Sequence, residues 1–431
     1  MQIVQASPGV LYLICAVFMS AFPGLYATSH NSLIFEDYVY RDNIKTVRMH
    51  AIGWEMSYPV IELESDDVLI FSFDDLDADV KNYQYRIIHC NADWTRSSLI
   101  PSDYMDGFFE NQIDNYRFSF NTFVSFTHYS LTIPNFDVSP RLPGNYILKV
   151  YEDFDVENVV LTRRFMINDP VVTIQARVHR PRQTKHYHTG QQLTFSIFHT
   201  ELNITDPHSE LFVTVMQNGR TDNSLKGINP MFIRSHEIVY EHDQKLIFPA
   251  GNEFRNFDTK SLRSRTEFIR NIEFSGGINH VELQTSDSRQ YSRYFSHHDI
   301  NGRYLIRNEE GRNPSIDADY VMVWFTLPWD VPFDNGNVYI LGQLGDWNFH
   351  QRNRMKYNYD NKAYELGMLL KQGYYNYHFA FLEEGASEAD ITIFEGNFFE
   401  TENDYFIKVY HRPPGSRIDR LVGAIRVNSR N

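Results

Sequence analysis

The chain has 431 residues, a formal net charge of -15 at neutral pH, and 42% hydrophobic against 22% charged residues. This length predicts about two to four domains, and the composition is typical of a folded protein. The net negative charge argues against a nucleic-acid backbone or an anionic membrane surface as the main partner. The 33 Phe and 27 Tyr residues favour β structure, because aromatic side chains pack well on pleated sheets.

An apolar stretch at residues 11–22 has the length of the core of an export signal and is too short to span a membrane. Pro23-Gly24 and the small residue Ala27 follow it, although no Lys or Arg precedes Arg41. We therefore predict a cleaved signal peptide over residues 1–27 and a body that is not membrane-spanning. Cleavage leaves Cys90 as the only cysteine, which excludes an internal disulfide.

Short alternating runs separated by turn residues predict three β-rich segments after the signal peptide. Asp169-Pro170 interrupts the strand pattern, and Gly311 to Ser315 resembles a second linker. We expect an all-β fold of tandem β-sandwich domains with few short helices. The predicted domains are an N-terminal sandwich at 28–168, a middle β-rich domain at 169–314 and a C-terminal sandwich at 315–431.

Patterns that carry chemistry are few. The run Asp74 to Asp79 fails as a calcium loop, since Val80 stands where a glycine turn is needed, and we interpret it as a solvated turn. The His297-His298 and His186-Tyr187-His188 groups lack metal-ligand spacing and are expected to be polar loop residues. No nucleophile elbow or phosphate-binding glycine loop occurs. The sequence thus predicts no enzyme activity, no cofactor and no metal.

The clearest element is Val338 to Phe381, in which alternating strands are separated by glycine, asparagine and aspartate turns. One of these turns carries Asp346, Trp347 and Asn348. A tryptophan between polar neighbours suits stacking on a sugar whose hydroxyls those neighbours bind. The alternative is that Trp347 folds back over the edge of the sandwich as a packing residue.

This element resembles the early-set β-sandwich module related to glycogen-binding domains. The shared pattern comprises the turn from Gly342 to Trp347, the strand residue Met355, and the aromatic run from Gly373 to Phe379. The resemblance covers the last quarter of the chain and implies a carbohydrate-binding ancestry.

A second resemblance extends over nearly all of the chain after the export signal. Its blocks are Asn43 to His50, Ser72 to Trp94, Gly144 to Asp153, Leu161 to Ile167, Phe248 to Arg263, Asp299 to Arg312 and Thr401 to Gly423. They resemble the plug protein family of the type IX secretion system, which occurs in the Bacteroidetes.

That resemblance implies a non-enzymatic periplasmic subunit on the inner side of the outer membrane. Its expected partner is the giant outer-membrane β-barrel translocon, whose periplasmic opening it would occlude. The alternative is a carbohydrate-binding protein of the cell envelope, which rests on Asp346, Trp347 and Asn348. An envelope glycosidase needs a placed pair of carboxylates, and no motif among the 55 acidic residues singles one out.

Overall fold

The computed structural model describes residues 33–241 and 243–430, and the described residues from Phe35 onward form one compact unit. The predicted signal peptide lies outside the described residues. Strands dominate the described part, and its α-helices are one turn long: α1 (Pro101–Tyr104), α2 (Pro207–Glu210), α3 (Pro314–Asp317) and α4 (Thr392–Glu395). The expected all-β fold with few short helices is confirmed.

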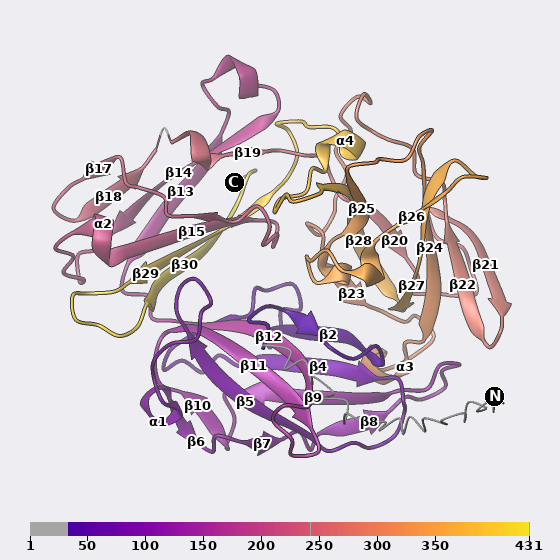
Figure 1. Cartoon of the computed structure of the whole chain (residues 1–431), viewed down its shortest axis with the longest axis horizontal. Helices are drawn as coiled ribbons and strands as arrows, with labels where there is room; N and C mark the ends of the chain where they lie inside the picture. Colours follow the sequence, from indigo (N-terminus) through magenta and orange to yellow (C-terminus); the bar gives the residue numbers. More distant parts are fainter. Residues whose placement is uncertain (1–32, 242, 431) are drawn as a thin grey trace, which may run out of the picture. The chain divides into compact units, whose positions relative to one another are not determined.

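The first lobe contains two main sheets around one apolar core (Figure 1). One sheet runs in the order β1 (Tyr38–Val39), β12 (Val159–Asn168), β11 (Gly144–Glu152), β5 (Tyr83–Cys90) and β7 (Asn111–Gln112), with β3 (Val60–Glu62) beside β12. The other is β2 (Ile44–Ala51), β4 (Leu69–Asp75), β9 (Thr127–Ile133) and β8 (Tyr116–Phe118). A small ribbon pairs β10 (Val138–Pro140) with β6 (Met105–Gly107).

Alternation along β4 shows why the first lobe folds as a sandwich. Leu69, Phe71 and Phe73 have no exposed surface and point into the core, where Phe73 stacks on Tyr129 with ring centroids 5.2 Å apart. Burial of side chains of this size contributes roughly 1.5–3 kcal/mol each. The intervening residues of β4 point to the opposite face of the sheet.

The second lobe is a sandwich completed by the end of the chain. Its first sheet consists of β13 (Thr173–His179), β14 (Gly190–Phe198), β18 (Glu237–Tyr240), β17 (Phe232–Ile233) and β19 (Ile247–Pro249). Its second sheet is β16 (Leu225–Lys226), β15 (Leu211–Gln217), β29 (Asp404–His411) and β30 (Arg420–Asn428). Figure 1 shows β29 and β30, drawn in yellow, beside β15.

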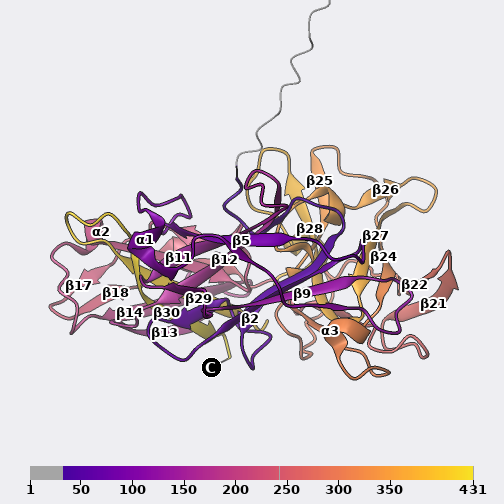
Figure 2. The ribbon, with the colours of Figure 1, turned by 90° about the horizontal axis from the view of Figure 1, so that it is seen from below.

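The third lobe is inserted between β19 and β29. One of its sheets contains β20 (Arg255–Asp258), β28 (Gly373–Glu383), β23 (Tyr304–Ile306) and β25 (Gly336–Leu341). The other runs β21 (Ile269–Ser275), β22 (Ile278–Leu283), β24 (Tyr320–Pro328), β27 (Ala363–Lys371) and β26 (Lys356–Asn358). The order from β27 through β24 and β22 to β21 can be followed in Figure 2.

These pairings differ from the predicted boundary near residue 314. Strands β20 to β23, expected in the middle domain, pair within the third lobe, as Phe257 does with Tyr375. Strands β29 and β30, expected in the C-terminal sandwich at 315–431, complete the second lobe, where Leu211 pairs with His411. Pairing between strands this distant in sequence leaves no local signal. The linker-like stretch at residues 311–315 therefore predicts a domain boundary that the strand pairing does not follow.

A shared apolar cluster joins the second lobe to the first. The ring of Phe406 on β29 stacks on Tyr58 of the first lobe, with centroids 4.3 Å apart. The buried members of the cluster are Cys90, Trp94, Ile147, Met166, Phe406, Tyr410 and Leu421. The first four belong to the first lobe and the last three to β29 and β30. The two lobes therefore share a core and do not merely touch.

Candidate functional site: the Trp347 turn and a polar cleft

The Asp346-Trp347-Asn348 turn follows β25 and a short 3-10 turn over Gln343–Gly345. Asp346 and Trp347 both adopt a left-handed backbone with φ 56°, which costs roughly 1–2 kcal/mol per non-glycine residue. Such a conformation persists where the surroundings hold the side chains in place. The contacts of the Asp346, Trp347 and Asn348 side chains hold this left-handed backbone in place.

Each predicted ligand residue of this turn contacts another part of the protein. Asp346 accepts a hydrogen bond from Arg163 of β12 at 2.8 Å and also pairs with Arg352. Asn348 donates to the carbonyl of Asp37 at 3.0 Å. Trp347 is half-buried, and its ring lies edge to face with Phe254 at 6.2 Å.

Two glycines make room for the Trp347 ring. A Cβ atom at Gly302 of the third lobe would lie 2.2 Å from the ring, and one at Gly219 of the second lobe would lie 3.1 Å from it. Both glycines have positive φ. The geometry thus gives Trp347 a packing role at a junction of the three lobes.

We expect Trp347→Ala to lower the free energy of unfolding by roughly 1–3 kcal/mol, because the hole between Gly219, Gly302 and Phe254 cannot collapse fully. Urea unfolding followed by far-UV circular dichroism measures this change. Trp324→Ala is the matched control, since Trp324 is 42% exposed on β24. Equal effects of the two substitutions would contradict the packing role.

The acidic run from Asp74 to Asp79 does not form one solvated turn. Asp77 and Asp79 are exposed as expected, but Asp74 and Asp75 at the end of β4 have no exposed surface. Asp75 accepts a hydrogen bond from the Tyr83 hydroxyl at 2.9 Å and pairs with Lys81 at 3.0 Å. The solvated-turn interpretation was wrong for these two residues, because β4 extends two residues further than expected.

Asp74 is the centre of a buried polar network between the first and third lobes. One of its oxygens lies 2.6 Å from the Lys371 ammonium and accepts from the Tyr320 hydroxyl at 2.7 Å. The other lies 2.6 Å from His128 Nδ1. Burial alone would raise the pKa of Asp74, but Lys371 and His128 together lower it below its usual value. The carboxylate is therefore charged at neutral pH.

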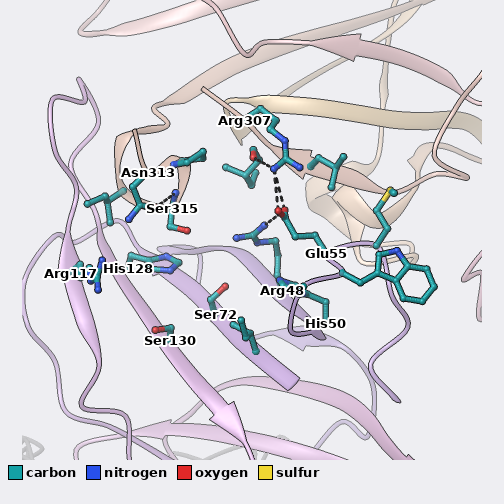
Figure 3. A pocket seen from close by; sticks show the side chains of 18 of the residues that line it. Arg48, His50, Glu55, Ser72, Arg117, His128, Ser130, Arg307, Asn313 and Ser315 are labelled. Carbon is teal, nitrogen blue, oxygen red and sulfur yellow. Dashed lines mark hydrogen bonds and ion pairs between the residues drawn. The ribbon is translucent and has the colours of Figure 1, made fainter. Parts of the chain in front are cut away.

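A polar cleft of about 690 Å³ lies beside this network (Figure 3). Its floor is the outward face of the β2–β4–β9–β8 sheet, where Arg48 is opposite Ser72 and Ser72 is opposite Ser130. This sheet forms one wall of the cleft, and the opposite wall is formed by Leu305 to Arg307 and Asn313 to Ile316 of the third lobe.

Glu55 bridges the two walls of the cleft. Figure 3 shows its carboxylate between Arg48, at 3.3 Å, and Arg307 of the third lobe, at 3.2 Å. Among the described residues of the lining, Glu55 is the only carboxylate, whereas Arg48, Arg117 and Arg307 supply three guanidinium groups. The cleft is thus locally basic in an acidic protein.

The histidines and the cysteine considered in the sequence do not form a metal or catalytic site in the described residues. His297 lies 2.9 Å from the Phe254 carbonyl, and among the described residues no three His, Cys, Asp or Glu side chains are grouped to hold a metal. Cys90 is buried, and desolvation raises the pKa of its thiol to about 12, so the thiol is protonated at neutral pH. No helix in the described part of the chain is long and apolar enough to cross a membrane.

Sequence reasoning missed the Asp74 network and the cleft. One signal was available: Asp74 continues the strand alternation of Leu69 to Phe73, and a carboxylate at a strand position within a folded layer needs a partner. Nothing local pointed to that partner, since Lys371 is 297 residues away.

The architecture is that of a multi-sandwich all-β protein with buried polar contacts between its lobes. The family model for the type 9 secretion system plug protein 1st domain matches residues 44–169, which span most of the first lobe. A crystal structure of a hypothetical protein from Parabacteroides merdae ATCC 43184 is 36% identical, with a TM-score of 0.89, and the match covers 92% of this chain and 100% of that one. No curated protein matches the chain.

The chain belongs to the type IX secretion system plug protein family. Membership associates it with that secretion system. The expected relationship of residues 338–381 to glycogen-binding modules stays a prediction.

Proposed function

We propose that this protein is a non-enzymatic periplasmic subunit that occludes the periplasmic opening of the outer-membrane β-barrel translocon of type IX secretion. The observation that carries the proposal is the match of residues 44–169 to the first domain of the plug family. Export by a cleaved signal peptide and a position on the inner side of the outer membrane belong to the same proposal.

A cap must keep its shape when it closes a wide aqueous pore, and the contacts between lobes support such a role. Buried ion pairs link the third lobe to the first through Lys371 and Asp74 at 2.6 Å, and to the second through Arg303 and Asp404 at 3.2 Å. The second lobe shares an apolar cluster with the first. A body joined at all three junctions closes an opening by size, with no cofactor required.

An aromatic edge on the first lobe is suited to contact the translocon. We define it as Tyr116, Phe118, Phe120 and Phe123, on β8 and the loop after it, whose side chains are 40%, 54%, 69% and 65% exposed. Phe123 also lies 4.5 Å, centroid to centroid, from exposed Phe274 on β21. Contiguous exposed apolar groups mark interaction sites, and aromatic residues carry much of the affinity in interfaces.

We expect the tagged protein to copurify with a very large outer-membrane barrel after gentle detergent extraction. A photo-crosslinking amino acid at Phe120 should capture that barrel in intact cells. The same group at Tyr291, which is 93% exposed on the third lobe, is the matched control. Capture from Tyr291 alone would reassign the contact surface, and recovery of the protein without any barrel partner would refute the proposed function.

A further inference from the structure

A second cavity, of about 160 Å³, lies where the three lobes meet. The first lobe contributes Trp94, Arg163 and Arg164 to its walls, the second lobe Lys408 of β29, and the third lobe Arg303 and Trp347. The Trp347 turn described above therefore forms part of this wall. The polar cleft of Figure 3 shares none of these residues.

Lys408 is a buried cation without a counter-ion. The residue is 6% exposed, and in residues 33–241 and 243–430 no group makes a hydrogen bond or ion pair with its ammonium. Its near neighbours are the ring of Trp94, at 5.9 Å from the nitrogen, and that of Phe406, at 6.0 Å. Taking an ammonium out of water without a partner is strongly unfavourable.

The charges around Lys408 increase this cost. Burial lowers the pKa of Lys408, and Arg164 on β12 and Lys226 on β16 lower it further, to about 7. No carboxylate in the described part of the chain is among the groups that shift this pKa. Lys408 is also opposite Thr214 on β15, whose buried hydroxyl has no partner among the described residues.

Arg163 adds a second open donor. Its Nη2 atom donates to Asp346 at 2.8 Å, while its Nη1 atom is buried and has no partner in the described part of the chain. The residue is 4% exposed. An unmade hydrogen bond on a buried charged group is costly, so a ligand oxygen at this donor would be favourable.

The two carboxylates of the walls are already engaged. Asp346 binds Arg163 and Arg352, and Asp37 accepts from the backbone N–H of Arg164 at 2.7 Å. Against them the lining carries five cationic side chains, Arg163, Arg164, Lys226, Arg303 and Lys408, of which Arg303 is also paired with Asp404 outside the lining. The cavity thus has an excess of positive charge, although the whole chain has a charge of -15.

The remaining walls are aromatic or apolar, with Trp94 and Trp347 joined by Met49, Met166 and Met216. A cavity of about 150 Å³ accommodates a molecule of the size of benzene. Flat groups pack well on tryptophan faces, and a site that combines apolar walls with few charged groups is typical of small-molecule binding.

We propose that this junction cavity binds a small organic oxyanion, with its carboxylate or phosphate head at Lys408 and its flat body against the ring of Trp94. The oxyanion supplies the missing counter-ion of Lys408, and Arg163 offers a further hydrogen-bond donor in the cavity wall. Because residues of all three lobes form the walls, the bound ligand also ties the lobes together.

Isothermal titration calorimetry on the purified full chain tests this proposal with benzoate, phenyl phosphate and inorganic phosphate. Benzamide, which has the shape of benzoate without its charge, is the matched ligand control. We expect benzoate or phenyl phosphate to bind and benzamide not to bind. Preference between the two binders identifies the head group, whereas binding of inorganic phosphate alone would overturn the proposed role of the aromatic walls.

Lys408→Met keeps the length of the side chain and removes its charge, and it should weaken binding at least tenfold. Lys356→Met, at an exposed position on β26, should leave binding unchanged. Absence of binding by both aromatic anions at about 10 mM, or equal affinity in the Lys408→Met protein, would overturn the proposal.

A measurement on the unmodified protein covers the case in which Lys408→Met does not fold. At pH 8 the ammonium is largely deprotonated in the free protein, since its pKa is about 7, and an anion beside it restores the proton. Titrations in two buffers of different ionisation enthalpy should therefore show uptake of nearly one proton per benzoate at pH 8, and almost none at pH 6. Binding without proton uptake at pH 8 would exclude Lys408 from the site.

Discussion

Replacing Asp74 by alanine is expected to lower the free energy of unfolding by about 3–5 kcal/mol, because the change leaves a buried ammonium without its partner. Lys371 is 1% exposed and lies 2.6 Å from Asp74, and within the described residues its one other hydrogen bond goes to the Ser315 carbonyl. Denaturant unfolding of the full chain measures the loss. Weakening should be greatest at the junction of the first and third lobes.

Asp79→Ala is the matched control for Asp74→Ala. Asp79 belongs to the same acidic run, but its side chain is 62% exposed, so its removal should change stability by less than about 0.5 kcal/mol. The double variant Asp74→Leu with Lys371→Met removes both charges and should recover much of the loss. A destabilised double variant together with a mild Asp74→Ala effect would contradict the assigned network.

The same pair predicts a pH dependence. The folded-state pKa of Asp74 lies below its unfolded value of about 3.9, so the unfolded chain binds the proton more readily. The contribution of the charged Asp74 to the free energy of unfolding is complete above about pH 4, and it is lost as the pH falls through the folded-state pKa. Acid unfolding should begin at higher pH in Asp74→Ala than in the unmodified protein.

Replacing Lys408 by methionine is expected to stabilise the ligand-free protein by roughly 2–4 kcal/mol at pH 6. The folded-state pKa of about 7 lies below the unfolded value of about 10.4, so the unfolded chain binds the proton more strongly between these limits. Stability of the unmodified protein therefore rises across this window, and the cost of burying the charge is complete below pH 7.

Unfolding curves at pH 6, 8 and 10 check this expectation. The advantage of Lys408→Met should be largest at pH 6 and shrink towards pH 10, whereas Lys356→Met should follow the unmodified protein at every pH. Parallel curves for Lys408→Met and the unmodified protein would show that Lys408 does not carry a buried charge.

Local patterns predicted much of the fold. Alternation and turn residues between Val338 and Phe381 predict strands separated by turns, and the structure forms β25, β27 and β28 there. Strand β8 ends at Phe118, and the aromatic residues Phe120 and Phe123 after it are exposed. An aromatic run satisfies the composition of a strand whether its side chains face a core or solvent.

Local sequence patterns did not predict the contacts between lobes. Trp347 was singled out for its chemistry, yet its surroundings depend on Gly219 and Gly302, which no spacing rule connects to it. The partners of Asp74 and the unpaired state of Lys408 depend likewise on strands paired across the chain. The local sequence pattern determines which residues form strands. Whether a charged residue between two lobes has a partner depends instead on which strands of those lobes come together.

The insertion of the third lobe has a consequence for the order of folding. Strand β15 has its partner β29 only after the whole third lobe has been made, since Leu211 pairs with His411. Until then one edge of β15 is open to other strands, and non-local pairing of this kind is slow and prone to aggregation. We therefore expect the newly made chain to need protection by a chaperone, and chains that end before residue 404 to aggregate through this edge.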